Sequence, residues 1–582
     1  MGNNPQRPRP IPSEINFVMM RGKAIQGPYT KKSVLKLEHL NMITPTNNAR
    51  VLNNKDHPLR IRSFKSTIGE GEMFWPKVHE IEGSTITLLA NAIVSLKNLE
   101  ELELQFTNVN ITREKQMFYL FSCIAKLKYL RKLSLKFNSC YGLTNSTILS
   151  LSNNLCFLRR LEHLDISFIG QTPFESSDYN RFTNWSLEKF YKSLARLRRL
   201  KSLTFGLESR NVLNTSLKNN SLLSVILKMA DLEKLSLKLR GMHVADENVN
   251  EFGFRLKKLK KLKSLGLDFR KRTFARNENL LLALVKIPRR LMSVEDKEKI
   301  TLKALSVGFT MDNETEATHF QMYKFAQSVK FLNGLKDLEI LLFGNNTIAV
   351  PEKMLTTLGE SLPHLDSLER LVLEMYTPFS GTFSGQALLV ESISKLVNLK
   401  SLKVHFPLKK DQNAVFVDGF YLNLTGGSLA KKLGQCLISL VNLEELTINF
   451  HVYGSVLEMG HGEIAALFRP ISKLKNLKAL KFETEANIRG KSIVEIGRQL
   501  EKLTELEDLT LDLNGVDPSI SDKDLIEFGN SLCMLTKLRS FKLYFPISAR
   551  LITEKSLDFV KENLFHLEFV GVFRRTHFRL HH

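Results

Sequence analysis

The segment LKNLEELELQF, Leu96 to Phe106, places leucine or phenylalanine at successive spacings of three, three, two and two. In its second half apolar and polar residues alternate, with Leu102, Leu104 and Phe106 forming the apolar set. Successive side chains of a β-strand point to opposite faces, so this alternation predicts a half-buried strand.

The same pattern, L-x-x-L-x-x-L-x-L-x-F, occurs fifteen times with small variations. The second Leu of each copy stands at positions 99, 130, 161, 200, 232, 262, 302, 335, 368, 399, 443, 477, 506, 538 and 567. Neighbouring copies are therefore 29 to 44 residues apart. A sustained period of this length indicates a repeat protein rather than a series of unrelated domains.

A helical pattern precedes each predicted strand. Segments such as LEKFYKSLARL, SIVEIGRQL and DLIEFGNSL carry apolar residues three and four positions apart. A strand, a helix and a further strand form a right-handed crossover, which makes successive strands parallel. The sequence therefore predicts an α/β solenoid.

On these residues the chain resembles the leucine-rich-repeat superfamily, in particular its long-repeat, ribonuclease-inhibitor-like branch. The resemblance covers about residues 83–573 and implies a fold, but says little about function. The chain departs from the family in one respect, because the Asn or Cys that usually follows the strand is mostly absent.

The spacings of strands and helices predict the shape and the division of the chain. Parallel strands lie about 4.8 Å apart, whereas packed helices need about 8 to 10 Å. We therefore expect a curved horseshoe of about fifteen repeats, with parallel strands on the concave face and helices on the convex face. We expect a basic N-terminal arm and cap at 1–82, the solenoid at 83–573 and a basic tail at 574–582.

The net charge is the unusual feature of the composition. The 582 residues include 83 Lys and Arg against 60 Asp and Glu, a formal charge of +23. Such an excess favours partners with an acidic surface, or RNA.

The cysteines and the apolar segments indicate the compartment. Five cysteines form no CxxC pair, which argues against a disulfide framework and a zinc site. The sequence has neither a secretory signal pattern nor a run of 18 apolar residues. We therefore expect no membrane span and an intracellular location, cytoplasmic or cytoskeletal, with the nucleus or an organelle as alternatives.

Residues 255–290 are the most basic stretch, with thirteen Lys or Arg against two acids. We predict a partner-binding basic patch whose members are Lys257, Lys258, Lys260, Lys261, Lys263, Arg270, Lys271, Arg272, Arg276, Arg289 and Arg290. The alternative is a solvated loop, together with cations that offset the negative ends of helix dipoles. The stretch holds a single loop aromatic, Phe274, so it lacks the aromatic interleaving that stacks on unpaired bases.

Two further regions are candidate contact surfaces. The outward strand positions carry mixed charges, for example Glu101 and Glu103 beside Lys132 and Lys136, which suits a specific protein partner. The longest interval holds an insertion at 407–428, in which we predict partner-binding aromatics at Phe416, Phe420 and Tyr421. The alternative is that this insertion packs on the solenoid.

We find no motif of catalysis, of metal binding or of nucleotide binding in the sequence. Gly460-His461-Gly462 is interpreted as a turn that opens a helix, and Ser521 with Asp524 as a helix N-cap. We therefore expect a chain that is not an enzyme, with no cofactor, no metal and no small-molecule substrate.

The sequence favours a non-catalytic protein–protein interaction scaffold in a larger intracellular assembly. It would dock acidic partners through its basic edge, its N-terminal arm and the faces of the solenoid. The alternative is an RNA-binding structural subunit of a ribonucleoprotein.

Overall fold

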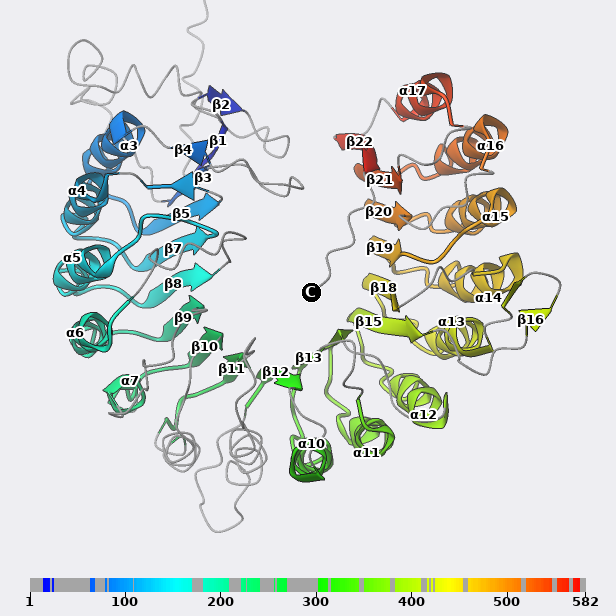
Figure 1. Cartoon of the computed structure of the whole chain (residues 1–582), viewed down its shortest axis with the longest axis horizontal. Coiled ribbons are helices and arrows are strands. Elements are labelled where there is room, and N and C mark those ends of the chain that lie inside the picture. Colours follow the sequence, from blue (N-terminus) through cyan, green and yellow to red (C-terminus); the bar gives the residue numbers. More distant parts are fainter. Residues whose placement is uncertain are drawn as a thin grey trace, which may run out of the picture. The chain divides into compact units, whose positions relative to one another are not determined.

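The computed structural model divides the chain into two compact units, Met1–Arg272 (the N-terminal unit) and Thr273–His582 (the C-terminal unit) (Figure 1). The structure describes residues 14–20, 23–25, 63–68, 79–80, 83–107, 109–111, 113–169, 182–208, 221–226, 228–240, 256, 259–268, 302–311, 316–344, 350–376, 383–409, 416–417, 420–421, 424–453, 459–513, 520–546, 552–564 and 569–575.

The main sheet of the N-terminal unit is parallel and follows the order of the chain. Its strands are β1 (Glu14–Met20), β3 (Ser63–Ile68), β5 (Glu101–Thr107), β7 (Lys132–Asn138), β8 (His163–Ile169), β9 (Ser202–Glu208), β10 (Lys234–Arg240) and β11 (Ser264–Asp268). Strand β2 (Lys23–Ile25) pairs antiparallel with β1. Strands β4 (His79–Glu80) and β6 (Val109–Asn110) form a separate parallel pair.

Helices precede the strands of this unit, as the crossover pattern predicts. They are α3 (Gly83–Ser95), α4 (Glu114–Ile124), α5 (Asn145–Leu155), α6 (Asn184–Leu194) and α7 (Ser221–Ile226). Within the unit the helices lie side by side on the outer side of the sheet (Figure 1).

The C-terminal unit repeats this arrangement. Its parallel sheet contains β12 (Ala304–Met311), β13 (Asp337–Gly344), β14 (Arg370–Tyr376), β15 (Ser401–Lys409), β18 (Glu445–Tyr453), β19 (Ala479–Thr484), β20 (Asp508–Leu513), β21 (Ser540–Pro546) and β22 (Phe569–Arg575). Its helices are α10 (Glu316–Val329), α11 (Glu352–Ser361), α12 (Phe383–Ile393), α13 (Leu424–Leu437), α14 (His461–Ile471), α15 (Gly490–Leu500), α16 (Asp522–Leu532) and α17 (Glu554–Asn563). A short 3₁₀ turn, Leu362–His364, follows α11.

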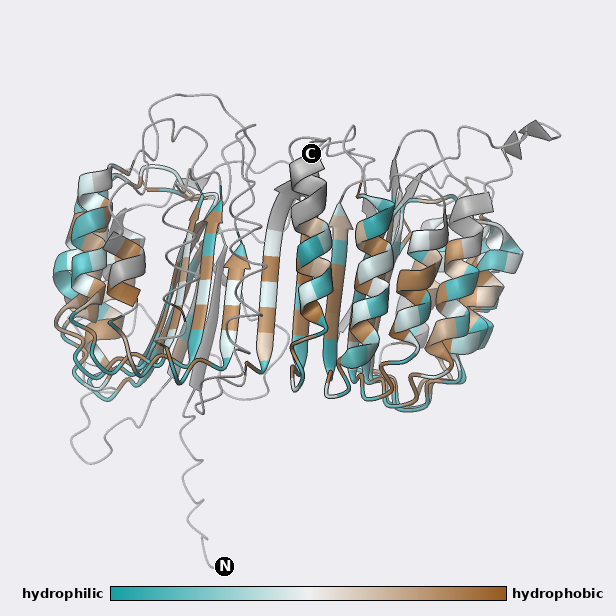
Figure 2. Ribbon diagram, turned by 90° about the horizontal axis from the view of Figure 1, so that it is seen from below, coloured by the Kyte–Doolittle hydropathy of each residue, from teal (hydrophilic) through white to brown (hydrophobic). Residues whose placement is uncertain are grey.

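Each of the fifteen copies of the leucine motif forms one strand, and the copies pair in register. Leu102 lies opposite Leu133, and Phe106 opposite Phe137. The rings of Phe106, Phe137 and Phe168 stack with centroids 5.1 and 5.2 Å apart. Figure 2 shows the resulting alternation of hydrophobic and hydrophilic residues along the strands. The fold is therefore a leucine-rich-repeat solenoid of the α/β class, in which each unit has its strands on the concave side and its helices on the convex side.

The turn between helix and strand is built in the same way in successive repeats. In the repeat of β7, the backbone N–H of Leu130 donates to the carbonyl of Leu127, and both side chains are buried. The residue after the turn then binds the previous repeat, since Arg131 N donates to Glu100 O at 2.8 Å. These bonds place the turns of neighbouring repeats beside one another on one edge of the sheet.

The parallel sheet extends into the region that carries no clear copy of the motif. Phe64 of β3 lies opposite Leu102, and Ile68 opposite Phe106, but Ser66 stands where the motif has leucine. The predicted division at residue 82 stays a prediction, and the tail from 576 onward lies outside the described residues.

Two local predictions are confirmed. Gly460 is the N-cap of α14, and its N–H donates to Glu463 Oε2 at 2.9 Å. Ser521 caps α16, and its N–H and hydroxyl both donate to Asp524 Oδ2, at 3.0 and 2.7 Å.

Candidate functional site

The predicted basic patch is described at three of its members, Lys260, Lys261 and Lys263. Lys261 Nζ lies 2.6 Å from Asp231 Oδ1, and Lys263 Nζ lies 2.7 Å from Glu233 Oε2. Both acids belong to the preceding repeat, and the hydrogen bonds from these lysines lower the pKa values of both carboxylates. Part of the charge of the patch is therefore neutralised within the chain.

The other members of the patch lie outside the described residues. They are Lys257, Lys258, Arg270, Lys271, Arg272, Arg276, Arg289 and Arg290. Their role in partner binding stays a prediction.

The insertion contains a short antiparallel pair of strands, β16 (Phe416–Val417) and β17 (Phe420–Tyr421). Phe416 lies opposite Tyr421, and Val417 opposite Phe420. The side chains of these residues lie outside the described part, so packing on the solenoid and binding of a partner both stay open.

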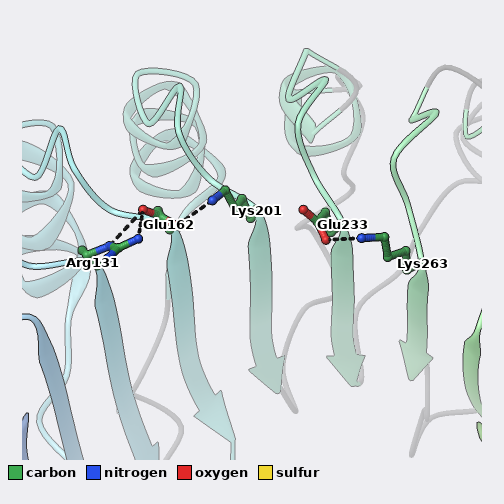
Figure 3. A network of polar contacts seen from close by, with 5 residues as sticks. All are labelled: Arg131, Glu162, Lys201, Glu233 and Lys263. Atoms are coloured by element: carbon green, nitrogen blue, oxygen red, sulfur yellow. Dashed lines mark hydrogen bonds and ion pairs between the residues drawn. The ribbon is translucent and has the colours of Figure 1, made fainter.

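An alternating ladder of ion pairs runs along the edge where the strands begin. In the N-terminal unit Glu162 lies between two cations, 2.7 Å from Arg131 and 2.8 Å from Lys201, and Glu233 pairs with Lys263 (Figure 3). The hydrogen bonds from Lys201 and Arg131 lower the pKa of Glu162 to about 2.

The C-terminal unit carries the same ladder. Glu369 lies between Lys336 and Lys400, and the hydrogen bonds from these two lysines lower its pKa to about 2. Lys478 pairs with Glu444 at 2.6 Å. Because cations and carboxylates alternate along this edge, one carboxylate can pair with cations of both neighbouring repeats.

A groove of about 700 Å³ follows this ladder in the C-terminal unit. Three asparagines line it and tie adjacent turns together, because each donates its side-chain N–H to a backbone carbonyl of the previous repeat. The donors are Asn398, Asn442 and Asn476, and the acceptors are Asp366, Val397 and Val441, at 2.8, 3.0 and 2.9 Å. The groove is thus lined by groups that already bind one another.

The concave face of the N-terminal unit is a mosaic of paired charges. Lys136 lies 3.0 Å from Glu103 and 3.8 Å from Asp165. Arg240 lies 2.9 Å from Asp268 and 3.9 Å from Glu208. The mixed charge that the outward strand positions predict is confirmed here.

The concave face of the C-terminal unit carries a run of aromatic rings across four neighbouring strands. The Phe343 and Tyr376 rings stack with centroids 4.4 Å apart and planes 16° apart. Tyr376 and His405 follow at 4.1 Å, and His405 and His451 at 6.0 Å. We call these four residues the aromatic run.

Charged groups orient the members of the aromatic run. Tyr376 donates its hydroxyl to Glu374 Oε2 at 2.9 Å, and Lys403 pairs with the other oxygen of this carboxylate. His451 Nδ1 lies 2.8 Å from Glu485 Oε2. These contacts hold the Tyr376 and His451 rings in place.

His405 is the buried member of the run. Its side chain is 5% exposed, and its Nε2 is buried without a hydrogen-bond partner among the described residues. Burial, followed by the neighbouring His451, lowers the pKa of His405 to about 3. The ring is therefore neutral and acts as a flat, weakly polar surface.

Sequence reasoning missed the aromatic run. Its signal was available, because Phe343, Tyr376, His405 and His451 all occupy outward positions near the ends of successive strands. Aligning the outward positions of the copies by their leucines would have shown aromatics in neighbouring repeats.

Three further observations concern the described part of the chain. No group of three or more His, Cys, Asp or Glu side chains in it could hold a metal ion. None of its helices combines the length and apolarity that crossing a membrane requires. All five cysteines are free thiols.

Comparisons with known proteins concern the fold alone. No protein-family model matches the sequence, and no curated protein matches it. Among solved structures, the internalin InlF of Listeria monocytogenes is similar at 12% identity and a TM-score of 0.26, over 88% of this chain and 90% of that one. The yeast complex of Rad7 and Elc1 is similar at 12% identity and a TM-score of 0.32, over 86% and 87%. At these values neither likeness supports an argument about what this chain binds, and the leucine-rich-repeat architecture follows from its own strands and repeats.

Proposed function

We propose that this chain is a non-catalytic protein–protein interaction scaffold of an intracellular assembly, and that it docks a partner on the concave face of its C-terminal unit. The observation that carries this proposal is the aromatic run, Phe343, Tyr376, His405 and His451, which crosses four neighbouring strands.

The chemistry of the run suits a protein partner. Aromatic side chains with fixed orientations supply much of the binding energy in protein interfaces, because little side-chain entropy is lost on contact. Phe343, Tyr376 and His451 are half-buried, so each retains surface to offer. Lys403 and Glu374 beside them provide charges of both signs, which set specificity.

Two titratable side chains of the aromatic run are engaged by neighbouring carboxylates, which supports a binding role rather than a catalytic one. Tyr376 is bound to Glu374, and His451 to Glu485. The five free thiols support a reducing, intracellular location. An acidic partner docking through the basic patch and the N-terminal arm stays part of the proposal.

Co-purification of the full chain from cells that express it tests this function. We expect Phe343→Ser with Tyr376→Ser to lose a stoichiometric protein partner, with affinity reduced on the order of tenfold or more for each aromatic. The matched control is Tyr119→Ser with Phe331→Ser, which removes one exposed tyrosine and one exposed phenylalanine elsewhere. Retention of the same partners by the concave variant contradicts the proposal.

A crosslinking measurement separates loss of docking from loss of folding. A photoreactive phenylalanine analogue in place of Tyr376 should crosslink to the partner in the otherwise unchanged chain. The same analogue in place of Tyr119 on α4 should not. Equal crosslinking at the two positions would move the interface away from the concave face.

A further inference from the structure

Three consecutive turns of the N-terminal unit gather on one edge of the sheet. They are residues 125–132, 156–163 and 195–202, which precede the paired strands β7, β8 and β9. Glu162 N donates to Arg131 O at 2.8 Å, and Lys201 N donates to Glu162 O at 2.7 Å. Side chains from the three turns therefore share one surface, which we call the basic turns.

The basic turns carry charge of almost one sign. They contain ten Lys or Arg and one acid, Glu162, which already binds Arg131 and Lys201. Six of the cations are exposed and form no ion pair with the described residues: Lys126, Lys128, Arg159, Arg196, Arg198 and Arg199. This differs from the predicted basic patch, where Lys261 and Lys263 are paired.

Helix dipoles account for at most two of these cations, Lys126 and Arg196, which directly follow the C-caps of α4 and α6. The last turns of α4 and α5 contain no basic residue. Arg159 follows the C-cap of α5, Cys156, by three positions, and Arg198 follows the C-cap of α6, Ala195, by three as well. The dipole interaction falls off within the last turn of a helix, so the cations three or four positions beyond the caps need another reason.

Two exposed aromatics lie among the cations. The Phe157 side chain is 64% exposed and that of Tyr129 is 47% exposed, and they stand in neighbouring turns. The Arg160 guanidinium lies 5.0 Å from the centroid of the Tyr129 ring, a cation–π contact that joins these two turns. A ring of this exposure offers a flat face on which a base can stack.

We propose that the basic turns bind single-stranded nucleic acid, with the arginines on the phosphate backbone and Phe157 and Tyr129 stacked on bases. Proteins that bind single strands without sequence preference combine positive charge along the backbone with exposed aromatic rings. Arginine is suited to phosphate because its planar fork donates two parallel hydrogen bonds.

An acidic protein surface fits these turns less well than a phosphate backbone. A specific protein interface presents charges of both signs, as the concave face of this unit does with Lys136, Glu103 and Asp165. The basic turns present charge of almost one sign and two exposed rings. This binding goes beyond the scaffold function proposed for the C-terminal unit and does not rest on it.

Fluorescence anisotropy of the full chain with a labelled single-stranded oligouridine of about 15 nucleotides tests the charge contribution. We expect Arg159→Gln, Arg198→Gln and Arg199→Gln together to weaken binding and to reduce the slope of log affinity against log salt by about 2, since each lost phosphate contact removes about 0.7. The matched control is Lys395→Gln, Lys473→Gln and Lys475→Gln, which removes the same charge from the equivalent edge of the C-terminal unit. A control that weakens binding as much as the arginine variant overturns the site, and so does the absence of binding at low salt.

The aromatic contribution has a separate test. Phe157→Ala should weaken oligouridine binding on the order of tenfold without changing the salt slope, because stacking involves no released counterion. The control is Met534→Ala, since Met534 occupies the same motif position and is 63% exposed. Equal effects of the two variants overturn the stacking.

Competition with polyglutamate distinguishes a phosphate backbone from an acidic polypeptide. We expect polyglutamate at equal charge concentration to displace the oligouridine only weakly, because it offers no bases to the aromatic rings. Displacement as effective as that by unlabelled oligouridine would identify the turns as a general polyanion surface and overturn the proposal. Unchanged thermal unfolding of each variant checks that these exposed positions leave the fold intact.

Discussion

The ammonium of Lys261 lies 2.6 Å from the carboxylate of Asp231, which stands one repeat earlier in the chain. This contact changes the interpretation of the most basic stretch of the sequence. A lysine that is paired within the solenoid offers less charge to a partner than the same lysine in a free loop. Six exposed cations that form no ion pair with the described residues lie two to four repeats earlier, in the basic turns.

The Lys261 pair predicts a titration that can be measured directly. The hydrogen bond from Lys261 keeps the pKa of Asp231 below its usual range. In Lys261→Met we expect this pKa to return toward the usual value, because the cation is gone. Carboxyl NMR titration follows it, with Lys475→Met as the control that removes a distant charge. An unchanged Asp231 titration in Lys261→Met would contradict the pairing.

The ladder of ion pairs predicts a dependence of stability on acid. Lys201 and Arg131 lower the pKa of Glu162 from 4.5 to about 2, so the folded state binds a proton at Glu162 less readily than the unfolded state does. The stabilisation is present above about pH 4.5 and is lost as the pH falls to about 2.

Thermal unfolding of Glu162→Gln tests this dependence. We expect its unfolding midpoint to lie below that of the natural chain at pH 7, and the difference to shrink as the pH falls from 4.5 to 2. Glu501→Gln, which removes an acid without a pair among the described residues, should show no such convergence. A difference between Glu162→Gln and the natural chain that is constant with pH would exclude the ladder as its cause.

His405 predicts a second pH dependence, in a higher window. Burial lowers its pKa from 6.5 to about 3. On acidification His405 is therefore protonated in the unfolded chain at a pH at which it stays neutral in the folded chain. His405 therefore destabilises the folded state increasingly as the pH falls below 6.5, by about 2 kcal/mol at pH 5.

Chemical denaturation at pH 7.5 and pH 5 measures this effect. Between pH 7.5 and pH 5, we expect the free energy of unfolding to fall by about 2 kcal/mol less in His405→Phe than in the natural chain. His163→Phe, at an exposed position of β8, should behave as the natural chain. Equal losses in the His405 and His163 variants would show that His405 is not held neutral.

The close approach of α13 and α14 predicts the effect of adding one methyl group. A Cβ on Gly434 would lie 2.3 Å from the backbone oxygen of Ala466, so Gly434→Ala must push the two helices apart. We expect it to lower the free energy of unfolding by about 1 to 3 kcal/mol, the usual cost of overpacking. Gly462→Ala in α14 meets nothing within 4 Å and should be neutral or stabilising, because alanine favours helix. Equal stability of the two variants would rule out the close contact.

The leucine spacing alone was sufficient to predict the architecture. Each copy of the motif alternates with period two and follows a segment with helical period, so its strand, its helix and their parallel order are all determined locally. The leucine spacing did not predict β1, β3 or the short strands β2, β4, β6, β16 and β17, and β3 was missed because Ser66 replaces the leucine that would have marked it as a copy. Strand β3 still joins the sheet, because its backbone pairs with that of the neighbouring strand β5.

The interaction surfaces depend on contacts between repeats, which the sequence of one repeat does not contain. Lys261 and Arg199 occupy the same place in their turns, yet Lys261 meets Asp231 and Arg199 meets no acid in the described part of the chain. Likewise Tyr376 and His405 become one surface only because β14 and β15 pair in one register. Local periodicity determines which residues are buried, whereas the register between neighbouring repeats decides which exposed side chains neutralise each other and which remain available to a partner.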